Sequence, residues 1–194
     1  MNMRMIAERQ EVPPRRMFTV RDVERMSETG VLKAEDRVEL IGGKLVTMNP
    51  RGARHETLKL AINSLWGRIC PPDMAFIPET TYRLSVDTFI EPDFLVFPRS
   101  VGIRGLNAET ALLAVELSDS SLGYDLGAKA LVYAHFGVRE LWVIDAVKLV
   151  VHVHRRPEDG RFGSIIAHGA ADLVVPEFAP AEFALRLADL DIRD

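Results

Sequence analysis

Two acidic residues lie in apolar stretches that have the composition of buried strands. Glu116 stands in LLAVELSDSS (112–121), and Asp93 precedes the apolar run FLVF (94–97). An ionised carboxylate that is buried without a partner costs several kcal/mol, so each acid must be paired, protonated or bound to a cation. Strands that are consecutive in sequence are neighbours about two-thirds of the time. We therefore expect both acids to point from one face of a sheet into one space.

Such an acid pair has the chemistry of a site for a divalent cation. Two carboxylates a few ångströms apart repel each other unless one holds a proton or a cation lies between them. Mg²⁺ (or Mn²⁺) suits the pair because it needs few protein ligands and keeps several waters. The backbone carbonyl of Leu117, the residue after Glu116, is a candidate third ligand. The sequence thus predicts a Mg²⁺ site made by Asp93, Glu116 and Leu117.

A lysine follows on the next predicted helix, residues 125–136. Asp125, Lys129 and Tyr133 are spaced i, i+4 and i+8, so they share one face, and the apolar neighbours of Lys129 turn it towards the sheet. A divalent cation, two acids and a lysine suit hydrolysis of a phosphodiester, because the metal activates water while the ammonium stabilises developing charge. An i, i+4 ion pair between Asp125 and Lys129 is the alternative that this spacing leaves open. We expect the Tyr133 hydroxyl to lie near the site.

The elements that must position these residues begin with two helices and a hairpin. Thr19 is the predicted N-cap of a helix that ends at Gly30. VELIGGKLVTM (38–48) has the pattern of a β-hairpin that turns at two glycines. Apolar residues recur at helical spacing over 54–69, and two prolines end that helix.

Strands dominate the rest of the chain. They are expected within 76–84, 89–97, 111–118, 140–145, 148–156 and 161–168, with a short strand or helical turn in the tail, 182–194. The order of helix, hairpin, helix, strands, helix and strands indicates a mixed α/β domain of the α+β type around one sheet. We assign residues 18–194 to a single domain and residues 1–17 to a flexible N-terminal arm.

Composition narrows the class of protein. The chain has 194 residues, 47% of them hydrophobic and 27% charged, which is typical of a globular domain. A net charge of −4 argues against a protein that coats nucleic acid non-specifically. The single cysteine, Cys70, excludes an internal disulfide, and no apolar run approaches the roughly 20 residues of a membrane span. We expect a cytoplasmic protein with no membrane partner.

The run from Glu91 to Asp145, EPDFLVF … LAVELSDSSLGYDLGAKALVYAHFGVRELWVID, resembles the Uma-two family, bacterial proteins catalogued as restriction endonucleases. That family belongs to the PD-(D/E)XK nuclease superfamily. The stretch RVELIGGKLVTMNPRGARHETL (37–58) is similar to the N-terminal part of the family, in which a β segment precedes a helix that starts at a histidine. The resemblance implies a restriction-endonuclease-like fold, with a central mixed β-sheet flanked by helices, and metal-dependent cleavage of DNA.

The resemblance also implies roles for single residues. Asp93 matches the aspartate of the PD motif, and Glu116 matches the second acid. The superfamily lysine, two positions after that acid, is Ser118 here, and the helix residue Lys129 is similar to the lysine that takes over in this family. Glu39 matches an N-terminal acid that could complete the metal shell, although strand alternation would turn Glu39 towards solvent.

Three further residues are candidates for substrate binding. His55 begins the helix at 54–69 and lies on its apolar stripe, where a phosphate contact competes with a packed, hydrogen-bonded histidine. Arg54 is adjacent in sequence and could meet phosphates. Tyr133 is the third candidate, through its hydroxyl.

We therefore interpret the chain as a Mg²⁺-dependent endonuclease that acts on DNA. Asp93 and Glu116 hold the metal, Lys129 polarises the phosphate or the water, and Glu39 assists. By analogy with restriction-like folds, we expect a homodimer. Two alternatives remain open: a non-catalytic interaction or dimerisation module on a nuclease-like fold, and a metal-dependent hydrolase of a smaller phosphoester.

Overall fold

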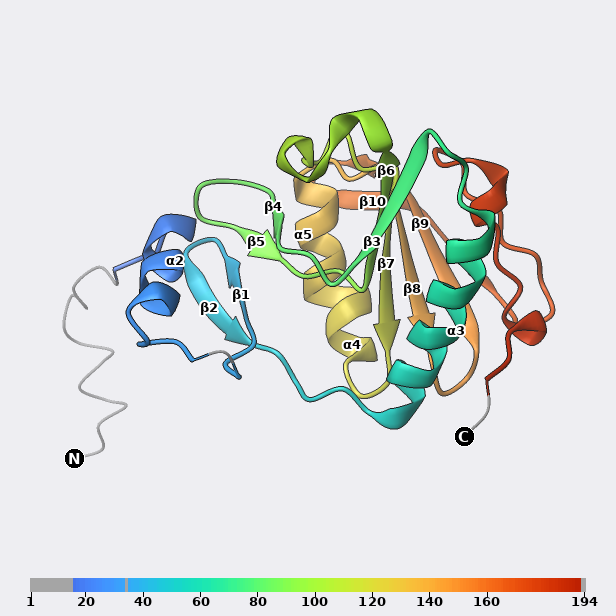
Figure 1. Cartoon of the computed structure of the whole chain (residues 1–194), viewed down its shortest axis with the longest axis horizontal. Coiled ribbons are helices and arrows are strands. Elements are labelled where there is room, and N and C mark those ends of the chain that lie inside the picture. The colour runs from blue at the N-terminus through green and yellow to red at the C-terminus, as the bar shows by residue number, and fades with distance from the viewer. Residues whose placement is uncertain (1–15, 34, 193–194) are drawn as a thin grey trace.

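A six-stranded mixed sheet carries the core of the protein (Figure 1). The structure, a computed structural model, describes residues 16–33 and 35–192, so most of the arm predicted at residues 1–17 lies outside the described residues. The sheet has the order β10-β9-β8-β7-β6-β3. β7 and β8 pair in parallel, and the other neighbours pair antiparallel. Its strands are β3 (Met74–Pro78), β6 (Phe94–Pro98), β7 (Leu113–Ser118), β8 (Glu140–Asp145), β9 (Val150–Glu158) and β10 (Arg161–His168).

Helices cover both faces of this sheet, which explains why β7 and β8 are buried at every position. On one face α3 (Ala53–Ile69) packs Leu58, Ile62 and Trp66 against the sheet. The other face is covered by α4 (Leu122–Tyr124), the π-helical turn η3 (Asp125–Lys129) and α5 (Ala130–His135). Figure 1 shows α3 and α5 on either side of β7 and β8. The predicted mixed fold with a central sheet flanked by helices is confirmed.

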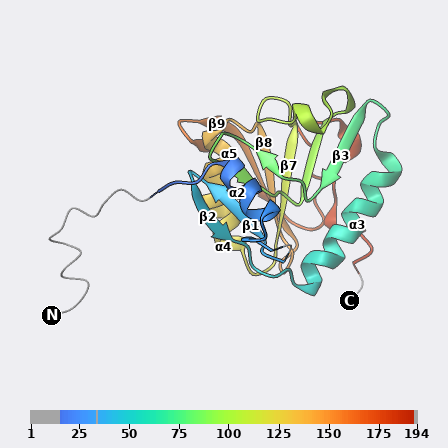
Figure 2. The ribbon, with the colours of Figure 1, turned by 60° about the vertical axis from the view of Figure 1, so that its left-hand side comes forward.

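A second sheet departs from the expectation of one sheet. It has the order β2-β1-β5-β4, formed by β1 (Val38–Ile41), β2 (Lys44–Thr47), β4 (Tyr82–Arg83) and β5 (Phe89–Ile90). The helix α2 (Val20–Glu28) packs Val20 and Val23 against it. In Figure 2 the β1–β2 hairpin and α2 come forward, on the side of the main sheet that carries α4 and α5.

The second sheet arises because two predicted strands each divide between the sheets. The stretch 76–84 contains the end of β3 and all of β4, separated at Glu79, whose φ of 50° breaks the extended backbone. The stretch 89–97 contains β5 and most of β6, separated at Pro92, which has no N–H to give to a ladder. Asp93 therefore lies between β5 and β6, at the junction of the two sheets.

Most of the other predicted elements are confirmed. Thr19 caps α2 in a capping box with Asp22, and the hairpin turns at Gly42 and Gly43 with φ of 53° and 74°. The helix predicted at 125–136 is longer and less regular, because it starts at Leu122 and contains the turn η3. The remaining 3₁₀ turns are η1 (Arg99–Val101), η2 (Ile103–Gly105), η4 (Ala181–Phe183) and η5 (Leu187–Asp189).

The tail follows neither a continuous strand nor a helix. It combines the turns η4 and η5 with one isolated bridge between Val174 and Leu185. Phe183, Leu185 and Leu187 are buried against the α3 face of the main sheet. No helix in the described ranges has both the length and the apolar character needed to cross a membrane.

Candidate active site

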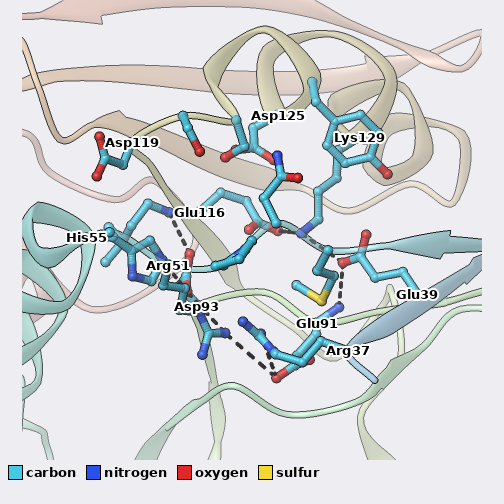
Figure 3. A pocket seen from close by; sticks show the side chains of 18 of the residues that line it. Arg37, Glu39, Arg51, His55, Glu91, Asp93, Glu116, Asp119, Asp125 and Lys129 are labelled. Carbon is cyan, nitrogen blue, oxygen red and sulfur yellow. Dashed lines mark hydrogen bonds and ion pairs between the residues drawn. The ribbon is translucent and has the colours of Figure 1, made fainter. Parts of the chain in front are cut away.

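Most of the predicted site residues surround one cavity of about 300 Å³ where the two sheets meet. Its walls come from the β1–β2 hairpin, the start of α3, the junction before β6, the end of β7 and the turn η3 (Figure 3). Six acidic side chains line it, against two arginines and one lysine. The charged residues among them, with His55, are Arg37, Glu39, Arg51, Glu91, Asp93, Glu116, Asp119, Asp125 and Lys129.

Asp93 and Glu116 come together because their strands are antiparallel neighbours. Phe94, the first residue of β6, pairs with Val115 of β7. Because the strands are antiparallel, Asp93, just before β6, lies beside Glu116, the next residue of β7. Both side chains are buried, with exposed fractions of 4% and 3%. The structure thus brings the two predicted acids into one space, as their sequence context led us to expect.

Lys129 reaches this space from the turn η3, on the face of the main sheet that carries α4 and α5. Its Nζ lies 2.9 Å from Oε1 of Glu116 and 2.9 Å from Oε1 of Glu39. The same Glu39 oxygen accepts the backbone N–H of Glu91 at 2.9 Å, and the hydroxyl of Tyr133 donates to Oε1 of Glu116. The ammonium therefore links β1 of the small sheet to β7 of the main sheet.

The electrostatics of this cluster follow from its burial and its excess of acids. Burial lowers the pKa of Lys129, but the adjacent carboxylates of Glu116 and Glu39 more than offset it, so the net effect is a raised pKa and a charged lysine. Burial raises the pKa of Glu116 well above its ordinary value, and the carboxylates of Asp93, Asp125 and Glu39 outnumber the single opposing charge of Lys129. The cluster therefore contains more acidic groups than the single positive charge of Lys129 can compensate.

Asp93 is held by partners from α3 and β7. Its Oδ1 lies 2.9 Å from Nε2 of His55, and its Oδ2 accepts the backbone N–H of Leu117 at 2.8 Å. Nη2 of Arg51 lies 3.8 Å from Oδ1. Burial raises the pKa of Asp93, but the hydrogen bond and charge of His55, with the Leu117 N–H, outweigh burial and lower it. Asp93 is therefore ionised and fixed in orientation.

The turn η3 determines how Asp125 and Lys129 are presented. In this π-helical turn both residues are buried, and π-helical turns inside α-helices occur frequently at functional sites. Asp125 accepts the hydroxyls of Ser118 at 2.7 Å and Ser121 at 2.5 Å, while Lys129 pairs with Glu39 and Glu116. The alternative of an Asp125–Lys129 ion pair is thus not what the structure shows. Burial raises the pKa of Asp125 although both hydroxyls oppose this effect.

Glu39, Tyr133 and Arg54 differ in their position relative to the cavity. Glu39 is 1% exposed, so the expectation from strand alternation that it faces solvent is wrong. The reason is that the small sheet packs this face of β1 over η3. Tyr133 donates its hydroxyl to Glu116, but it is not among the cavity-lining residues of the described chain. Arg54 is exposed on α3 and likewise lies outside that lining, whereas its neighbour His55 is inside it.

Sequence reasoning missed several residues that the structure places in the cavity wall. Arg37 and Glu91 flank strands of the small sheet, and no pattern in the sequence predicts that sheet. Asp119, in the loop after β7, also lines the cavity. Its Oδ2 lies beside Gly52, the N-cap of α3, where an added Cβ would come within 2.1 Å. The Asp119 carboxylate is therefore accommodated by a glycine.

The cavity offers oxygen donors for a hard cation. Asp93, Glu116 and Leu117 line it together, and each has an oxygen that could bind a cation. No group of three or more His, Cys, Asp or Glu side chains in the described part of the chain is arranged to hold a metal ion. An ion at this cavity would therefore rely on two carboxylates, backbone oxygen and water, which is the coordination that Mg²⁺ commonly uses.

The mixed sheet flanked by helices is a restriction-endonuclease-like fold, with one acid just before β6, one on β7 and a lysine on the helix that follows. The chain belongs to the Uma2 (Uma-two) family, described as "Putative restriction endonuclease", whose model matches residues 20–188. The resemblance seen in the sequence is confirmed.

A solved structure gives the same fold class. A protein of Anabaena variabilis ATCC 29413, described as a putative nuclease belonging to DUF820, is 20% identical with a TM-score of 0.66, covering 89% of this chain and 96% of that chain. The type IIG restriction endonuclease BpuSI is 16% identical with a TM-score of 0.38, covering 66% of this chain and 14% of that chain, and we draw no conclusion from it. No protein of curated function matches the sequence.

Proposed function

We propose that the protein is a Mg²⁺-dependent endonuclease that hydrolyses phosphodiester bonds of DNA. The observation that carries this proposal is the position of Asp93, just before β6, beside Glu116 of β7 at one cavity, with the ammonium of Lys129 2.9 Å from Glu116. Membership of a family described as restriction endonucleases supports the choice of substrate. Nuclease chemistry needs acidic ligands, a cation beside them and a path for a phosphate, and the cavity residues suit each requirement.

The donor set fits the proposed metal. Asp93, Glu116 and the carbonyl of Leu117 are all oxygen donors, and the excess of acidic over basic side chains around the cavity favours binding of a cation. Mg²⁺, when bound, would activate a water and neutralise charge on the scissile phosphate.

The residues of the chain then have separate tasks. His55 and the Leu117 N–H hold the Asp93 carboxylate in place, and Tyr133 does the same for Glu116. Lys129 supplies positive charge beside Glu116, where it can stabilise the charge that develops on the phosphate. Glu39 fixes the Lys129 ammonium from the other sheet.

Glu116→Gln tests the proposal, because it keeps the shape of the side chain but removes its negative charge. We expect it to abolish Mg²⁺-dependent cleavage of DNA while the circular-dichroism spectrum stays that of the folded protein. Glu28→Gln, an exposed acid at the end of α2, is the matched control and should cleave like the wild type. Undiminished cleavage by Glu116→Gln would overturn the assignment.

One observation favours the second candidate, a non-catalytic interaction module. Asp93, Glu116 and Glu39 already have cationic or hydrogen-bonding partners within the chain, so the fold does not require a metal for charge compensation. This candidate predicts that the protein binds no Mn²⁺. Calorimetric titration with Mn²⁺, on the wild type and on Glu116→Gln, separates the two functions.

A further inference from the structure

Two arginines that the proposed chemistry does not use face the same cavity from either end of the β1–β2 hairpin. Arg37 immediately precedes β1, and Arg51 precedes Gly52, the N-cap of α3. Both line the cavity and lie on either side of Glu91 (Figure 3). The Nη2 atom of Arg37 is 3.4 Å from Oε1 of Glu91, and that of Arg51 is 3.8 Å from the same oxygen.

The two guanidinium groups have hydrogen-bonding capacity that the chain does not use. Both Nη2 atoms are buried and have no hydrogen-bond partner among the described residues. Their contacts with Glu91 bring opposite charges together without forming hydrogen bonds, and the Nη1 atom of Arg51 is occupied by Glu79. A buried guanidinium N–H without an acceptor is unfavourable, so a ligand with acceptor oxygens would be stabilised there.

The location of these free N–H groups indicates which part of a substrate they would meet. Nη2 of Arg51 is also 3.8 Å from Oδ1 of Asp93, one of the two acids at the centre of the site. Lys129 is paired with two carboxylates, whereas the Nη2 atoms of the two arginines are buried nitrogens of the cavity wall without an acceptor among the described residues. The planar fork of a guanidinium matches two phosphate oxygens, which makes arginine well suited to hold a phosphodiester.

We propose that Arg37 and Arg51 form a phosphate-binding pair that holds a backbone phosphate of the DNA strand next to the scissile one. This inference rests on the nuclease function proposed above and adds the substrate group recognised at the edge of the site. Glu91 keeps the two guanidinium groups side by side before the substrate arrives. The backbone N–H of Glu91 donates to Glu39, so the pair is also tied to the residue that fixes Lys129.

A binding assay with a chosen probe tests the pair separately from cleavage. The probe is a fluorescein-labelled single-stranded oligodeoxynucleotide of about a dozen nucleotides, because its flexible backbone can enter the cavity. Its affinity is measured by fluorescence anisotropy in the presence of Ca²⁺, which takes oxygen ligands as Mg²⁺ does. We expect Arg37→Gln and Arg51→Gln each to weaken binding about tenfold and to reduce the slope of log affinity against log salt by about 0.7. Arg104→Gln, an exposed arginine of η2 outside the cavity, is the matched control and should bind like the wild type.

A probe with one neutral methylphosphonate linkage identifies the phosphate that the pair contacts. For the wild type, neutralising that linkage should weaken binding about as much as losing one arginine does. For Arg37→Gln or Arg51→Gln, the same linkage should cost nothing further, because the contact is already absent. Arg37→Lys and Arg51→Lys keep the charge and the pairing with Glu79 or Glu91, so they should fold even if a glutamine variant does not, and should bind with intermediate affinity.

The outcomes distinguish this inference from the nuclease proposal. Weaker binding by the arginine variants without cleavage by the wild type would support the phosphate pair and overturn the nuclease function. Cleavage and binding by all folded arginine variants at wild-type levels would overturn the pair and leave the nuclease function standing. A wild type that does not bind the probe, or linkages that cost the same in every variant, would also overturn the pair.

Discussion

The ammonium nitrogen of Lys129 lies 2.9 Å from Oε1 of Glu116, and this contact joins a π-helical turn to the centre of the main sheet. Tyr133, one helical turn further on, donates its hydroxyl to the same oxygen. Glu39 of the small sheet contacts the other side of the ammonium. One buried lysine therefore compensates acids from both sheets, and its loss should affect folding as well as chemistry.

Lys129→Met should lower the free energy of unfolding strongly. The unbranched methionine keeps much of the packing but leaves Glu39 and Glu116 buried without a cation, which costs roughly 3–5 kcal/mol. Urea denaturation followed by circular dichroism measures the loss. Lys148→Met, an exposed lysine after β8, is the control and should change the stability little.

A double variant checks that the loss comes from the unpaired acids. In Glu39→Gln/Lys129→Met one of the two stranded carboxylates is gone, so the combined loss should be smaller than the sum of the single losses by roughly 0.5–3 kcal/mol. Strictly additive losses would contradict a shared interaction between these residues.

Two glycines near the site should respond differently to alanine. At Gly52 the added Cβ would lie 2.1 Å from Oδ2 of Asp119, whereas at Gly127 in η3 no atom lies within 4 Å. Gly127→Ala should therefore stabilise the protein by about 0.5–1 kcal/mol through the unfolded chain. Gly52→Ala should gain less or lose slightly, because its Cβ must displace the Asp119 carboxylate, the flexible end of a side chain, from the cavity wall. Thermal denaturation compares the two, and equal effects would show that Asp119 does not pack against Gly52.

A buried acid outside the cavity, Glu140, should have a structural role. Glu140 is fully buried and accepts hydrogen bonds from Trp142, from Arg155 and from the backbone of Glu177 and Phe178. Glu140→Gln turns an amide towards these donors, and we expect a loss of roughly 3–5 kcal/mol in the free energy of unfolding.

The matched control for this variant uses the other acid bound by the same arginine. Glu177 has a half-exposed side chain, 51%, and its Oε2 lies 3.4 Å from Nε of Arg155. Glu177→Gln should cost little, because solvent replaces the lost contact. Neither residue lines the cavity, so the folded fraction of both variants should keep the affinity of the wild type for the oligonucleotide probe. Similar losses in stability for the two variants would contradict the role assigned to burial.

Local patterns predicted the elements around the site well. The glycine pair of the hairpin, the apolar stripe of α3 and the apolar runs of β6 and β7 each encode a local structure that the fold keeps. The proximity of Asp93 and Glu116 follows from these runs, because consecutive strands commonly pair. The identity of the acid pair was thus accessible without coordinates.

The remaining parts of the site depend on long-range packing. Glu39 alternates with apolar residues and looks solvent-facing along its own strand, and it is buried because η3 lies over it. The spacing of Asp125 and Lys129 is the same in an α-helix and in the π-helical turn that the chain forms, so the sequence could not separate them. Arg37 enters the cavity beside a sheet that combines the predicted hairpin with parts of two predicted strands. The periodicity within those two strands does not show where each one divides.

His154, which lies on β9, should make stability depend on pH. Its ring is buried, its Nδ1 lies 3.0 Å from the carbonyl oxygen of His152, and its Nε2 has no hydrogen-bond partner among the described residues. The ring also packs edge-on against Phe162. Burial lowers the pKa of His154, with the charge of His152 acting in the same direction and the hydrogen bonds to the backbone opposing it.

The sign of the effect follows from the lowered pKa. In the unfolded chain the ring has its ordinary pKa of about 6.5, so as the pH falls below that value the unfolded state takes up a proton that the folded state does not. The stability contributed by the neutral ring is present above about pH 6.5 and is lost as the pH falls through the lowered pKa of the folded state. Urea denaturation between about pH 7 and pH 5 should show a steeper decline for the wild type than for His154→Gln, which cannot titrate. His135→Gln, at an exposed histidine of α5, should keep the wild-type slope, and a His154→Gln slope equal to that of the wild type would show that the folded state accommodates the charged ring.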